Sequence, residues 1–73
     1  MVQGITNMFK TEALINRNPD VKIRAIDALE VMARGRYLPS NVKVIKAALS
    51  YIASEGDEPS KKAAKGSLCR LAR

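Results

Sequence analysis

The 73-residue sequence contains no histidine and no tryptophan, and its single cysteine is Cys69. One thiol cannot form a disulfide within the chain, and no cluster of cysteines and carboxylates has the spacing of metal ligands. Acid–base catalysis usually needs histidine or a carboxylate in a pocket, and no carboxylate here falls within an apolar stripe. These residue types predict a protein that is not an enzyme and has no cofactor, metal site or small-molecule substrate.

Long apolar runs and a basic leader are also missing from the sequence. No stretch approaches the ~18 apolar residues that cross a bilayer, and Met1 to Ile5 shows no basic patch followed by an apolar run. We therefore expect a cytoplasmic protein that binds no membrane, and the single free thiol fits a reducing compartment. Aromatic side chains are few, which leaves little surface for stacking the bases of single-stranded nucleic acid.

A chain of this length forms one domain, residues 1–73, with a thin core. Such a small domain buries only about 60% of the surface that its unfolded chain exposes. With no disulfide or metal to compensate, stability must come from good helix packing or from another chain. The size therefore favours a protein that self-associates or needs a partner.

Apolar residues recur at helical spacing in four segments that turn residues separate. We predict helices over residues 6–16, 19–34, 40–54 and 59–72. Thr6, Asn18 and Ser40 are candidate N-caps, and Gly35 can close the second helix in the left-handed conformation. Because no run of residues alternates with period two, the predicted fold is all-α, with hairpins over about 5–34 and 40–73.

The apolar stripes of these segments define a predicted core. Its members are Phe9, Val21, Ala25, Leu29, Met32, Ile45, Leu49, Ile52, Leu68 and Leu71, with Ala28 and Ala48 at close contacts. Asp27 and Glu30 lie beside the stripe of the second helix, and we expect both to be solvated. Gly66 falls in the middle of the fourth helix, where glycine costs about 1 kcal/mol relative to alanine. A closely approaching backbone would explain a glycine there.

The second and fourth helices look like copies of one another at an offset of 39 residues. Val21-Lys22, Ala25, Ala28-Leu29 and Met32-Ala33 correspond to Ser60-Lys61, Ala64, Ser67-Leu68 and Leu71-Ala72. A turn that contains proline and an acid precedes each copy. The shared turn chemistry and spacing indicate an internal repeat of a helix pair.

One of these copies resembles a known repeat family. Its residues are Asn18-Pro19-Asp20-Val21-Lys22 with Ala25, Ala28 and Leu29. They are similar to the second half of a HEAT repeat, a helix hairpin of about forty residues. The second copy departs from the pattern at Ser60, where valine is usual. The resemblance implies a binding scaffold that presents helix faces to proteins or, in some members, to nucleic-acid backbones. The two hairpins would then stack in a HEAT-like manner or close as a compact four-helix bundle.

A second resemblance concerns the loop segments of the chain. Leu38-Pro39-Ser40-Asn41-Val42-Lys43, followed by Ser54-Glu55-Gly56-Asp57, is similar to a small archaeal family of all-helical proteins. That family has no assigned activity, so this resemblance implies a helical fold and no function.

The net charge of +6 is distributed unevenly along the chain. Residues 1–30 contain four basic and four acidic residues, whereas the remainder contains nine basic residues and three acids. Such an asymmetry either indicates an anionic partner or only keeps the protein soluble. The candidate nucleic-acid-binding residues are Lys43, Lys46, Lys61, Lys62, Lys65, Arg70 and Arg73. Cys69 lies among these lysines, which would favour its thiolate form. It is either a redox or cross-linking site or a tolerated small residue.

Two functions remain open from the sequence. The first is a non-catalytic module that binds a protein partner, or its own copy, through a helix face. The second is a small basic protein that binds the nucleic-acid backbone without sequence preference. A helix–turn–helix reader of DNA bases is less favoured, because neither central helix has the asparagine, glutamine and arginine cluster that base readout needs.

Overall fold

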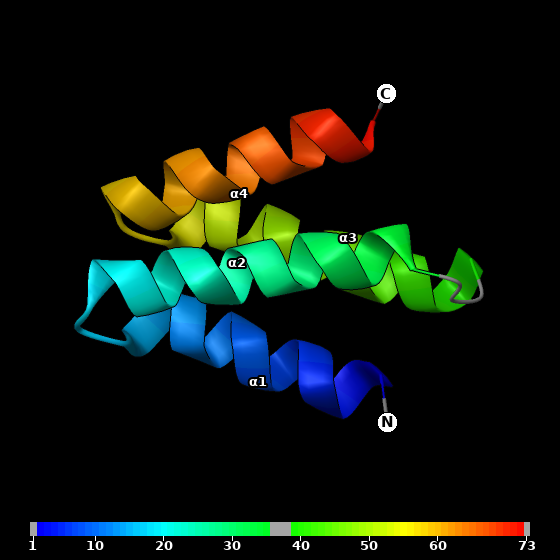
Figure 1. The fold of residues 1–73 in the computed structure, drawn as a ribbon, viewed down its shortest axis with the longest axis horizontal. Helices are drawn as coiled ribbons and strands as arrows, with labels where there is room; N and C mark the ends of the chain where they lie inside the picture. The colour runs from blue at the N-terminus through cyan, green and yellow to red at the C-terminus, as the bar shows by residue number, and fades with distance from the viewer. Residues whose placement is uncertain (1, 36–38, 73) are drawn as a thin grey trace.

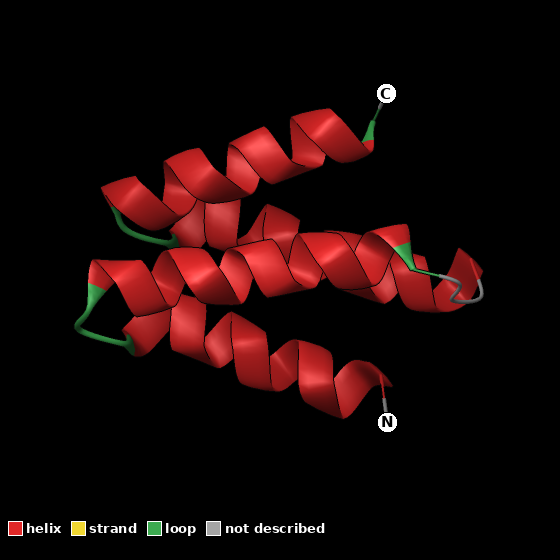
Figure 2. Ribbon diagram, in the orientation of Figure 1, coloured by secondary structure: helices red, strands yellow, loops and turns green. Residues whose placement is uncertain are grey.

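The computed structural model describes residues 2–35 and 39–72. In these ranges the chain forms four helices and no strand, as Figures 1 and 2 show: α1 (Val2–Ile15), α2 (Pro19–Arg34), α3 (Pro39–Glu55) and α4 (Glu58–Leu71). The prediction of an all-α fold with four helices is confirmed. None of these helices is long and apolar enough to cross a membrane.

The start of α2 follows directly from local sequence chemistry. The Asn18 side chain accepts a 2.9 Å hydrogen bond from the Asp20 amide, and Pro19 occupies the first turn, where its missing N–H leaves no hydrogen bond unmade. At the other end, Gly35 has φ −73° and ψ −178°. The expected left-handed conformation of Gly35 is therefore wrong: the helix ends in extended backbone, with the Gly35 amide donating to the Met32 carbonyl at 3.0 Å.

Three predicted helix starts lie too late in the sequence; α4 begins at Glu58, one residue earlier than predicted, and the other two involve candidate N-caps. Helix α1 begins at Val2, so Thr6 is a buried residue inside the helix and not its N-cap. Helix α3 begins at Pro39, which places Ser40 in its first turn. In both cases a hydroxyl side chain that could cap a helix lies within one, because propensity alone does not fix where helical hydrogen bonding begins.

The four helices form two antiparallel hairpins, α1–α2 and α3–α4, that lie side by side. Helix α1 packs on α2 and α3, α4 packs on the same two helices, and α1 and α4 make almost no contact. Figure 1 shows α1 and α4 at opposite edges with α2 and α3 between them. Helix α2 is thus stacked beside α4 and α3 beside α1, and each neighbouring pair of helices forms one long face of the molecule.

The core fills the space between the two hairpins. Its fully or nearly fully buried apolar residues are Ala13, Ala25, Ile26, Leu29, Ile45, Ala48, Leu49, Ile52 and Ala64. Phe9, Met32, Leu68 and Leu71, which we expected in the core, are half-buried at its edge. Val21 and Ala28 are also half-buried and lie outside this cluster, because their side of α2 faces away from the second hairpin. Ile26 takes their place at the centre.

Two glycines differ sharply in what surrounds them. A Cβ at Gly56 would lie 2.6 Å from the Ile52 carbonyl oxygen, so the turn between α3 and α4 requires glycine there. A Cβ at Gly66 would meet only Arg70 Nη1, at 3.4 Å. Among the residues described, no backbone of another helix approaches Gly66, and the close packing that we considered for this position is absent.

Candidate interaction surfaces

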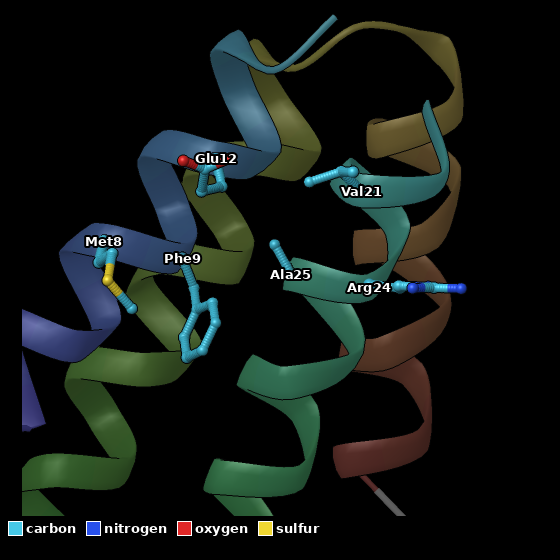
Figure 3. A pocket seen from close by; sticks show the side chains of 6 residues that line it. All are labelled: Met8, Phe9, Glu12, Val21, Arg24 and Ala25. Atoms are coloured by element: carbon cyan, nitrogen blue, oxygen red, sulfur yellow. The ribbon is translucent and has the colours of Figure 1, made fainter. Parts of the chain in front are cut away.

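A shallow apolar groove of about 390 Å³ runs along the outer face of the first hairpin. Its lining residues are Met8, Phe9, Glu12, Val21, Arg24 and Ala25. Figure 3 shows Phe9 lying between the two helices, with Val21 and Ala25 pointing from α2 toward α1. Arg24 also lines the groove, and the end of its side chain extends from α2 away from α1. The groove therefore has an apolar floor, with one acid on the α1 side and one base on the α2 side.

Further exposed apolar side chains border this groove. Ile5 lies one helical turn before Met8 on α1, and Val31 lies one turn after Ala28 on α2. Met8 is 55% exposed and Val31 69%. Single exposed apolar residues are ordinary, but a continuous apolar surface marks an interaction site. We call this surface, made of Ile5, Met8, Phe9, Val21, Ala28 and Val31, the α1–α2 face.

A buried polar cluster joins α2 to α4. Glu30, only 8% exposed, accepts hydrogen bonds from Arg70 Nη2 at 2.6 Å, Arg70 Nε at 2.9 Å and Ser67 Oγ at 2.8 Å. Arg34 adds an ion pair at 2.9 Å from the same helix. The bidentate Arg70 hydrogen bonds hold the pKa of Glu30 at about 2, because they stabilise the charged form more than burial disfavours it. The expectation that Glu30 is solvated is wrong, whereas Asp27 is exposed as expected.

Two further polar contacts tie the hairpins together at the end where the loops lie. Lys22 forms an ion pair with Asp57, and this hydrogen bond lowers the pKa of the Asp57 carboxyl. The buried Ser60 hydroxyl donates to the carbonyl of Ala13 at 2.9 Å. These contacts and the Glu30 cluster fix how hairpin two sits on hairpin one, so they have a structural role.

The predicted basic residues are not equivalent in the structure. Lys43, Lys46, Lys62 and Lys65 are exposed, and Lys61 is half-buried. Arg70 binds Glu30 through two of its nitrogen atoms, so its charge is largely neutralised within the fold, an arrangement that argues against a role in binding phosphate. Arg73 lies outside the described residues. The structure thus leaves four exposed lysines, two on α3 and two on α4, which we refer to together as the basic surface.

A second hollow lies between α1 and α3. It measures about 380 Å³, and its lining residues are Gln3, Asn7, Lys10, Val44, Ala47, Ala48 and Tyr51. Lys10 Nζ lies 5.1 Å from the centre of the Tyr51 ring, within range of a cation–π contact. This contact covers part of the apolar surface with a charged side chain, which distinguishes the hollow from the more apolar α1–α2 groove.

Cys69 is exposed on α4 as a lone thiol. Residues 2–35 and 39–72 contain no group of three or more cysteine and carboxylate side chains placed to hold a metal ion.

No family model, curated protein or solved structure matches this chain. The resemblances to HEAT repeats and to an archaeal helical family therefore stay predictions from the sequence.

The sequence of α1 contains the apolar residues of the α1–α2 face. Ile5, Met8 and Phe9 recur at helical spacing, a pattern that usually marks a buried stripe, whereas the structure leaves Ile5 and Met8 largely exposed. Glu30 carried no such signal, because its partner Arg70 is 40 residues away in the sequence.

Proposed function

We propose that this chain is a non-catalytic interaction module that binds a protein partner, or another copy of itself, through the α1–α2 face. The observation that carries the proposal is the apolar groove with its border of exposed Ile5, Met8 and Val31. A small domain gains little by leaving such side chains in water, because burying one fully is worth about 1.5–3 kcal/mol. We propose a cytoplasmic location for this activity, in keeping with the residue types.

Site-specific photo-crosslinking tests this proposal. A photoreactive phenylalanine analogue replaces Met8 in the groove, and a matched variant carries it at Ser50, an exposed position on α3. In cells that make the protein, we expect the Met8 position to form a covalent adduct with a protein that mass spectrometry then identifies. Adducts of equal yield at both positions, or none at Met8, would contradict the proposal.

A second candidate function is non-specific binding of nucleic acid by the basic surface. The supporting observation is that Lys43, Lys46, Lys62 and Lys65 are exposed and have no ion-pair partner within residues 2–35 and 39–72. Phosphate contacts give affinity without sequence preference and depend strongly on salt. Arg70 does not belong to this proposal, because Glu30 already binds it.

Neutralising Lys62, Lys65 and Arg73 together tests the second candidate. If these residues bind phosphate, affinity falls equally for unrelated sequences, and the salt dependence flattens by up to about three units of slope. The fold is expected to persist, because Lys62 and Lys65 are exposed. An unchanged affinity and slope in a folded triple variant would assign the charge to solubility.

A further inference from the structure

We propose that the partner of the α1–α2 face is a second copy of this chain, bound through the same face about a two-fold axis. This inference rests on the proposed function and goes further, because it names the occupant and the register. It follows from the internal repeat, the charges beside the groove and the size of the face.

The 39-residue offset identifies the surface of hairpin two that corresponds to the α1–α2 face. Hairpin two packs on hairpin one through Ser60 and Ser67, which are fully buried. The corresponding positions of hairpin one are Val21 and Ala28, on the opposite side of the molecule. The α1–α2 face is thus the equivalent of a surface that is buried in hairpin two, and it is more apolar than its counterpart. Such a face is suited to packing against another pair of helices.

The opposite end of the molecule is not complementary to this face. Hairpin one uses Ile26, fully buried, where it packs on hairpin two. The corresponding residue of hairpin two is Lys65, which is exposed. Head-to-tail stacking of chains would therefore bury a lysine in place of an isoleucine, at a high desolvation cost. Copies that meet through identical α1–α2 faces avoid this cost and form a closed dimer instead of an open filament.

The charges beside the groove select one register for such a dimer. Glu12 lies on α1 and Arg24 on α2, and no ion pair involves either among the described residues. Placing α1 over the α1 of the other copy would set Glu12 against Glu12. Placing α1 over the partner's α2 sets Glu12 against Arg24 twice, which is favourable once the exposed Arg24 side chain turns toward the groove.

The overall charge and size of the molecule fit the same arrangement. Residues 1–30 carry no net charge and Arg34 adds only one positive charge to hairpin one, so two first hairpins can meet while the more basic second hairpins point apart. A standard interface buries about 800 Å² per partner, which is about a sixth of this chain's 4870 Å² of accessible surface.

Sedimentation equilibrium of charge-reversal variants tests this proposal. The wild-type chain is expected to dimerise, and Glu12→Arg or Arg24→Glu alone should each weaken the dimer at least tenfold, because like charges then meet twice. An equimolar mixture of the two variants, and the double variant, should dimerise as the wild type does. Glu55→Arg, an equal charge change on exposed α3, is the control and should dimerise normally.

Circular dichroism of each variant verifies the fold. This control matters most for Glu12→Arg, because it removes the 2.9 Å hydrogen bond that Asn16 Nδ2 donates to Glu12 Oε2. A wild-type chain that stays monomeric at millimolar concentration overturns the dimer. Single variants that dimerise normally, or a mixture that stays monomeric, overturn the proposed register and with it the proposal. A Met8 crosslink to a different protein only would overturn the second copy as partner and leave the proposed function standing.

Discussion

The Glu30→Gln substitution removes the charge at the centre of the α2–α4 contact while keeping the side chain's size. Glu30 binds Arg70 through both carboxylate oxygens and also accepts from Ser67. In the variant, Arg70 and Arg34 lose their anionic partner, and one amide group replaces an acceptor oxygen with a donor. We expect the free energy of unfolding at pH 7 to fall, because neutral hydrogen bonds are weaker than charge-assisted ones.

The magnitude follows from the pKa of the carboxyl. A pKa that falls from 4.5 to about 2 on folding corresponds to roughly 3 kcal/mol, at about 1.4 kcal/mol for each unit. Solvent screens part of this, because the Arg70 and Arg34 side chains are 49% and 56% exposed. We therefore expect a loss of about 1–2 kcal/mol. In a domain of this size, that lowers the melting temperature by roughly 5–15 °C.

The pH dependence of unfolding gives the sharper test. Because folding lowers the pKa of Glu30, its contribution is fully present above pH 4.5 and is lost as the pH falls toward 2. Urea unfolding of wild type and Glu30→Gln at several pH values should therefore show a stability gap that closes between pH 4.5 and 2. Glu55→Gln, at an exposed position, is the control and should show little gap at any pH. A Glu30→Gln gap that does not change with pH would refute the reasoning.

Three further substitutions test local features of the fold by thermal or urea unfolding. Gly66→Ala should raise the free energy of unfolding by about 1 kcal/mol, because the new methyl group meets only Arg70 at ordinary contact distance; a loss of stability would show that α4 is packed differently. Gly56→Ala should lower it, because the added Cβ would lie 2.6 Å from the Ile52 carbonyl oxygen, and an unchanged stability would contradict the turn. Asn18→Ala should lower it by about 1 kcal/mol through loss of the α2 cap, whereas Asn18→Gly should cost only a few tenths; equal losses for both would contradict a capping role.

Local chemistry made α2 predictable from the sequence. Pro19 and Asn18 determine its start, and the predicted range of 19–34 agrees with the helix in the structure. Helix α1 was harder, because Thr6 has the residue type of an N-cap, yet helical hydrogen bonding begins four residues earlier. The conformation of Gly35 was also not determined by its residue type, since glycine permits the left-handed conformation without requiring it.

The burial of charged and apolar residues depended on long-range contacts that sequence patterns do not encode. Glu30 is buried because Arg70 and Ser67 reach it from α4, and a helical wheel of α2 alone places it beside the stripe. Val21 has the position of a core residue on that wheel, but it lies in the groove beside α1, on a side of α2 that the second hairpin does not cover. The repeat offset explains this, because Val21 corresponds to Ser60 of hairpin two, which hairpin one does cover.

Dilution of the protein, followed by methyl and amide NMR spectra, tests most directly whether the α1–α2 face is the binding surface. If a second copy occupies it, signals from Met8, Val21 and Val31 shift with concentration, while those from Lys46 and Lys65 on the basic surface stay constant. Spectra that do not change with concentration, or changes centred on α3 and α4, would contradict self-association through the α1–α2 face.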